Sequence, residues 1–75
     1  MNAVKELFIP FENDPLRLGR LSLYETHAGL EVHIDIVFEE SRKIYQHLTI
    51  IRSNDSEDEV IQNALIELRQ RVAKK

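Results

Sequence analysis

A strict alternation of apolar and polar residues over 30–38 is the clearest pattern in the chain. Its apolar members are Leu30, Val32, Ile34, Ile36 and Phe38. The intervening positions hold Glu31, His33, Asp35 and Val37. Successive side chains of a strand point to opposite faces, so this period of two predicts a half-buried antiparallel strand with one polar face.

A second strand is predicted over 16–25, although its leucines change phase half-way. They are Leu16 and Leu18 in one phase, and Leu21 and Leu23 in the other. We therefore predict a β-bulge at Gly19 and Arg20, because one inserted residue would keep all four leucines on the core face. A short turn over 26–29 would join this strand to the first, with Gly29 in a left-handed conformation.

A third strand is predicted over 42–52, after a turn at 39–41. Its core face would hold Ile44, Gln46, Leu48 and Ile50. Its outward face would hold Lys43, Tyr45, His47, Thr49 and Ile51. This phase buries one glutamine, whereas the opposite phase would bury a lysine and a histidine, so we prefer the first.

The last segment has helical periodicity and predicts an amphipathic helix over 56–74. Its apolar stripe consists of Val60, Ile61, Ala64, Leu65, Leu68 and Val72. Ser56 and Glu59 have the spacing of a capping box, in which each side chain satisfies a free backbone N–H of the first turn. Acidic residues begin this helix and basic residues end it, so both groups interact favourably with its dipole.

Together these elements predict a single α+β domain over 1–75. An antiparallel three-stranded β-meander (16–52) would pack on one C-terminal helix (56–74) in two layers, because each layer has one apolar face to cover. Residues 1–15 would add an irregular or short N-terminal element. This element is either one or two helical turns or a short strand, and Pro10 would either end it or mark a sheet edge.

Composition excludes several classes of function. The chain has 75 residues, no cysteine and a formal net charge of −3. Without cysteine there are no disulfides, thiolate metal sites or thiol nucleophiles, and a reducing cytoplasm is the expected location. The slightly acidic balance argues against direct nucleic-acid binding, and no apolar run is long enough to span a membrane.

The polar face of the sheet offers one candidate for chemistry. Strand register would place Arg20 opposite Asp35, and either Asp35 or His33 opposite His47. Such a cluster can act as a carboxylate–histidine acid/base pair, or His33, Asp35 and His47 can bind a metal ion. The alternative is a solvated sheet face with cross-strand polar pairs. A flat face lacks the concavity of an active site, so we predict no catalytic residue, metal or cofactor and keep this cluster as an alternative function.

Apolar and aromatic residues on the same face favour a protein partner instead. We predict a non-enzymatic interaction or accessory module, as is typical of small phage or mobile-element proteins. It would form a homo-oligomer such as a homodimer, or bind a larger protein, through the outer sheet face or an edge strand. The residues predicted to bind the partner are Val37, Tyr45, His47 and Ile51.

A third hypothesis uses the acidic residues of the second turn and the helix start. They are Glu39, Glu40, Asp55, Glu57, Asp58 and Glu59. If they share one end of the molecule, the chain would be an acidic inhibitor of a nucleic-acid-binding protein. The element order is similar to that of double-stranded RNA-binding domains, but lysines start the last helix of such domains, so acidic residues there exclude that function.

Overall fold

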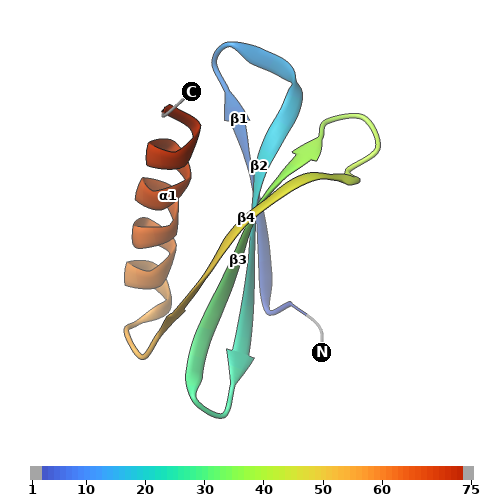
Figure 1. Ribbon diagram of the computed structural model, residues 1–75. Helices are drawn as coiled ribbons and strands as arrows, with labels where there is room; N and C mark the ends of the chain where they lie inside the picture. Colours follow the sequence, from blue (N-terminus) through green and yellow to red (C-terminus); the bar gives the residue numbers. More distant parts are fainter. Residues whose placement is uncertain (1–2, 74–75) are drawn as a thin grey trace.

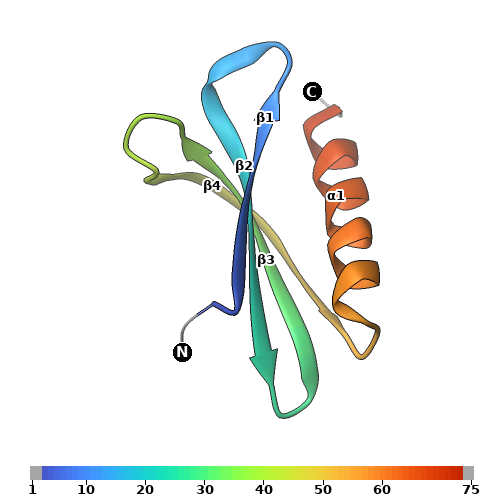
Figure 2. The ribbon, with the colours of Figure 1, turned by 180° about the vertical axis from the view of Figure 1, so that it is seen from behind.

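The computed structural model describes residues 3–73 and consists of one antiparallel sheet with a helix packed on one face (Figure 1). The elements are β1 (Lys5–Phe11), β2 (Asp14–Thr26), β3 (Gly29–Phe38), β4 (Ile44–Ser53) and α1 (Glu57–Ala73). The strands lie in the order β1-β2-β3-β4, so the sheet is a simple meander. Figure 2 shows that α1 covers one face only, and we call the other face the outer face. The predicted α+β class with a C-terminal helix is confirmed.

The predicted number of three strands is wrong, because the N-terminal segment forms a fourth strand, β1. Leu7, Ile9 and Phe11 alternate along it and pack, half-buried, against the core. Leu7 pairs with Leu21 of β2. Pro10 is tolerated because β1 is an edge strand, where a missing backbone N–H need not interrupt a ladder. Such a short alternation could not be distinguished from a helical turn in the sequence.

Strand β2 pairs with the whole of β3, from Arg17 opposite Phe38 to Thr26 opposite Gly29, without a register shift. The predicted β-bulge at Gly19 and Arg20 is therefore wrong. Gly19 instead allows α1 to approach the sheet closely, since a Cβ atom at this position would lie 2.5 Å from Cδ2 of Leu68. Leu18 consequently faces away from the helix. The predicted turn is confirmed, with a φ of 126° at Gly29.

Two register shifts in the β3–β4 ladder leave Leu48 and Tyr45 without paired residues, so each forms a bulge. Each extra residue reverses the alternation of side chains along β4. Ile51 therefore packs against the core, whereas Ile50 lies on the outer face. The faces predicted for these two isoleucines are wrong, and Gln46 is exposed rather than buried.

Helix α1 begins after Ser56, whose Oγ accepts a hydrogen bond from the backbone N–H of Glu59 at 3.4 Å. The predicted apolar stripe is confirmed. Its members Val60, Ala64 and Leu68 are fully buried, and Ile61, Leu65 and Val72 are half-buried. They face the sheet residues Leu21, Leu23, Val32 and Ile34, which complete the core. The predicted helix end at Lys74 lies outside the described residues. Within residues 3–73, no helix is long and apolar enough to cross a membrane.

Candidate functional site

The outer face carries a row of polar side chains that crosses three strands. Asp35 of β3 lies between Arg20 of β2 and His47 of β4. Nη2 of Arg20 donates to Oδ2 of Asp35 at 3.1 Å, and Nδ1 of His47 lies 2.6 Å from Oδ1. Both carboxylate oxygens are therefore engaged. The juxtaposition predicted from strand register is confirmed for these three residues.

Burial makes the pairing of Asp35 important. Its side chain is only 4% exposed, and a charge removed from water is costly unless it is paired. Arg20 supplies that pairing, although its Nε is itself buried with no hydrogen-bond partner in the described structure. When Asp35 is ionised, Nδ1 of His47 donates to it, because an ionised carboxylate only accepts hydrogen bonds. Nε2 of a neutral His47 then keeps a free lone pair.

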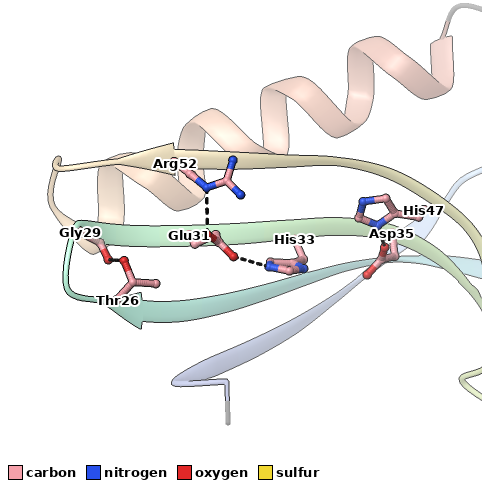
Figure 3. A network of polar contacts seen from close by, with 7 residues as sticks. All are labelled: Thr26, Gly29, Glu31, His33, Asp35, His47 and Arg52. Atoms are coloured by element: carbon pink, nitrogen blue, oxygen red, sulfur yellow. Dashed lines mark hydrogen bonds and ion pairs between the residues drawn. The ribbon is translucent and has the colours of Figure 1, made fainter. Parts of the chain in front are cut away.

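A second carboxylate–histidine pair lies nearer the start of β3 (Figure 3). Nε2 of His33 lies 2.7 Å from Oε1 of Glu31, and Nε of Arg52 donates to Oε2 at 3.0 Å. These hydrogen bonds, that from His33 above all, hold the pKa of Glu31 below its ordinary value. The His33 ring also packs against Tyr24, with ring centres 4.7 Å apart. Both imidazoles are thus oriented by a carboxylate.

The two pairs bring His33 and His47 together, with their ring centres 6.4 Å apart. However, within residues 3–73 no three histidine, cysteine, aspartate or glutamate side chains converge as metal ligands. Asp35 is occupied by Arg20 and His47. The three residues considered as ligands in the sequence therefore do not form a three-ligand centre.

Two of the four residues predicted to bind a partner are not accessible on the outer face. Val37 is fully buried. Arg42 of the β3–β4 turn lies over the ring of Phe8 in β1, 4.5 Å from its centre, so this turn reaches across the outer face. Ile51 lies on the helix side of the sheet, against the core. The prediction that Val37 and Ile51 present accessible surface on the outer face is therefore wrong.

Tyr45 is exposed, but it lies on the helix side of the sheet rather than on the outer face. Its ring contacts that of Phe38, with centres 5.4 Å apart, and the Arg17 guanidinium stacks on it at 4.5 Å. Arg17 pairs with Phe38 in the β2–β3 ladder, two residues along from the pair of Gly19 and Ile36. Arg17 and Phe38 therefore face the same side of the sheet as that pair, which is the helix side. The bulge at Tyr45 explains why its predicted face is wrong.

These aromatic rings belong to a cluster of exposed apolar side chains at one end of the sheet. The cluster, which we call the open-end patch, comprises Leu16, Phe38, Ile44 and Tyr45. Leu16 is 74% exposed, the most exposed large apolar residue in the described structure. Its carbonyl accepts a hydrogen bond from Glu39, which follows Phe38. Strand β2 therefore begins beside the end of β3, and the four side chains gather at this end of the sheet. Phe38 and Tyr45 lie on the helix side, whereas Ile44, which pairs with Val37, and Leu16, which shares the phase of Leu18, lie toward the outer face.

A cleft of about 830 Å³ adjoins the open-end patch. It is lined by residues of the β1–β2 turn and of the C-terminal half of α1, two segments that lie toward the same end of the molecule in Figures 1 and 2. Its apolar walls come from Ile9, Phe11, Ile36, Leu68 and Val72, and Leu16 lies at its border with the patch. Arg17 and Arg69 also line it. Arg17 is held by Asp14 at 2.6 Å, a hydrogen bond that raises the pKa of the guanidinium.

The acidic residues of the third hypothesis do not share one end of the molecule. Glu39 and Glu40 precede β4, whereas Asp55 and the acidic first turn of α1 follow it. A ten-residue strand spans about 30 Å. One member of the second group, Glu57, is paired with Lys5 at 3.2 Å. The prediction of a single acidic surface is wrong.

No protein family, curated protein or solved structure matches this chain. Sequence reasoning missed the cleft and the position of the patch. The available signal was Gly19, because a glycine inside a strand often marks the close approach of another segment.

Proposed function

We propose that the chain is a non-enzymatic protein-interaction module that binds a second copy of itself through the open-end patch and the adjoining cleft. The observation that carries this proposal is the exposure of four large apolar side chains at one end of the sheet, beside an uncovered cleft. Contiguous apolar patches on small proteins are typical of interaction surfaces. Tyrosine, phenylalanine and arginine, which meet here, are enriched in such surfaces.

Shape supports a second copy as the partner. A two-fold symmetric dimer uses the same surface on both chains, so that surface must fit itself. The open-end patch projects exposed side chains, and the cleft beside it is hollow. Because Leu16 belongs to both, a two-fold axis near this residue would place the patch of each copy in the cleft of the other.

Charge supports the same arrangement. Arg69 lines the cleft and forms no ion pair within the described residues. Glu39 and Glu40 follow directly after Phe38 of the patch. The exchange of patch and cleft would bring the arginine of one copy toward the glutamates of the other. A net charge of only −3 opposes such an association weakly.

The test is sedimentation of the purified chain from about 1 µM to about 1 mM, a range that covers weak and moderate association. We expect a reversible monomer–dimer equilibrium. Ile44→Glu should shift it to monomer, because it places a charge in the patch. Ile66→Glu is the matched control, since Ile66 is 52% exposed, close to the 55% of Ile44, but lies on α1 outside the patch.

A chain that stays monomeric over this range would contradict the proposal, as would equal effects of the two substitutions. Binding only to a different protein through the same patch would replace self-association with a heterologous partner. We further propose the cytoplasm as the location, because a chain without cysteine suits a reducing compartment.

A further inference from the structure

We propose that His33 and His47 form a two-histidine site for a late first-row divalent metal ion such as Zn²⁺ on the outer face. The inference goes beyond self-association and uses a different surface. It rests on the juxtaposition of two imidazoles from neighbouring strands, with ring centres 6.4 Å apart. Solvent molecules would supply the remaining ligands.

Each imidazole is already oriented in the way that metal-binding histidines usually are. A ligand histidine typically donates its second ring N–H to a carboxylate, which fixes the tautomer and makes the other nitrogen a better ligand. Asp35 does this for Nδ1 of His47 at 2.6 Å, and Glu31 for Nε2 of His33 at 2.7 Å. The nitrogens left over, Nε2 of His47 and Nδ1 of His33, have no hydrogen-bond partner within residues 3–73.

The two carboxylates are themselves held in place. Arg20 binds the second oxygen of Asp35, and Arg52 binds that of Glu31. Arg20 and Asp35 are largely buried, so this half of the support is rigid. Both carboxylates are engaged by arginine and histidine and are thus poor candidates for direct ligands. The two imidazoles are the ligands, and the carboxylates position them.

The ring spacing suits one ion between the two side chains. Two metal–nitrogen bonds of about 2.0–2.1 Å, together with the distance from each nitrogen to its ring centre, place the ring centres at most about as far apart as observed. The tetrahedral geometry of Zn²⁺ needs the ring centres about 1 Å closer than this linear limit. His47 can supply this movement, because its side chain is half-exposed on an edge strand. Imidazole nitrogens select zinc, nickel and copper over magnesium and calcium.

The chain contains its own control in its third histidine. His27 lies in the β2–β3 turn and is exposed. No carboxylate hydrogen bond to its ring is formed within the described residues. A metal ion that binds any exposed imidazole would therefore reach His27 at least as easily as the proposed pair.

The experiment is a Zn²⁺ titration of the untagged, metal-free chain, followed by calorimetry and by the imidazole signals in NMR spectra. We expect the His33 and His47 signals to move together at one stoichiometric site, while His27 does not respond. His47→Ala should remove this binding, and His27→Ala should leave it unchanged. Glu31→Ala keeps both ligands and should weaken affinity about tenfold to a hundredfold.

Several results would overturn the inference. Equal responses of all three histidines would show adventitious imidazole binding only. Displacement of Zn²⁺ by equimolar Mg²⁺ would indicate a carboxylate site instead. The absence of saturation below about 1 mM Zn²⁺, a weak affinity for any specific site, would show that the pair is structural. The NMR titration uses the wild-type chain, so its outcome does not depend on whether any variant folds.

Discussion

Substitution of Gly19 by alanine tests how closely α1 is packed on the sheet. An ideal Cβ atom at this position would lie 2.5 Å from Cδ2 and 3.2 Å from Cδ1 of Leu68. Leu68 is fully buried and packed among the core residues, so moving its side chain away from the new methyl group would disturb those contacts. The backbone of Gly19 does not have a positive φ, and alanine is therefore compatible with the strand itself. The collision with the helix is the dominant effect.

The expected cost follows from two opposing contributions. Inserting a methyl group into a packed core typically destabilises by about 1–3 kcal/mol. Replacing glycine restricts the unfolded chain and returns about 0.4–1 kcal/mol. We therefore expect Gly19→Ala to lower the free energy of unfolding by about 1–2 kcal/mol. For a domain of this size, that corresponds to a fall in Tm of roughly 5–15 °C.

Urea denaturation of four chains measures this effect and identifies its cause. They are wild type, Gly19→Ala, Leu68→Val and the double variant. Leu68→Val removes both Cδ atoms that the new methyl group would meet, at a cost of about 1 kcal/mol by itself. In that background, Gly19→Ala should be nearly neutral, so the two effects would not be additive. A stabilised Gly19→Ala variant, or additive effects, would refute the close helix–sheet contact.

Two further variants test the polar networks of the outer face. Glu31→Gln should destabilise the fold at neutral pH and have no effect at about pH 2. A carboxyl whose pKa falls on folding stabilises the folded state only when it is ionised, and this contribution is lost as the carboxyl becomes protonated at low pH. A stability difference from wild type that is independent of pH would contradict this. Asp35→Ala should cost about 3 kcal/mol, near the lower limit for a broken buried pair, since Arg20 retains some access to solvent. Arg20→Met with Asp35→Leu should recover part of that loss in thermal denaturation, and no recovery would mean that the charge pair is not the cause.

The elements predicted well from the sequence are those in which one pattern extends over many residues. Strand β3 alternates without interruption, and its alternate residues Val32 and Ile34 are fully buried as expected. The stripe of α1 and the cap at Ser56 are also correct. The pairing of residues across the outer face is also predicted correctly, because a tight turn that ends at Gly29 fixes the β2–β3 register and places Arg20 opposite Asp35.

The errors occur where a single residue changes the phase of a strand. The phase change at Gly19 was attributed to a bulge, but β2 is regular, and Leu18 lies on the outer face opposite Val37. The glycine is required by the helix above it, and helix–sheet contact is a tertiary property that no local pattern contains. The bulges of β4, at Tyr45 and Leu48, carry no glycine or proline that would have revealed them.

These two bulges position both candidate sites. Counted back from Ile51 on the helix side, regular alternation would place His47 on the same side, away from Asp35. The bulge at Leu48 reverses the alternation and brings His47 to the outer face, where Asp35 orients it. The second bulge moves Tyr45 to the helix side, where it joins Phe38 in the open-end patch. An edge strand tolerates such irregularity because only one neighbour must pair with it. The irregular β4 is therefore the part of the fold that places His47 in the ionic network of the outer face and Tyr45 beside Phe38 on the helix side.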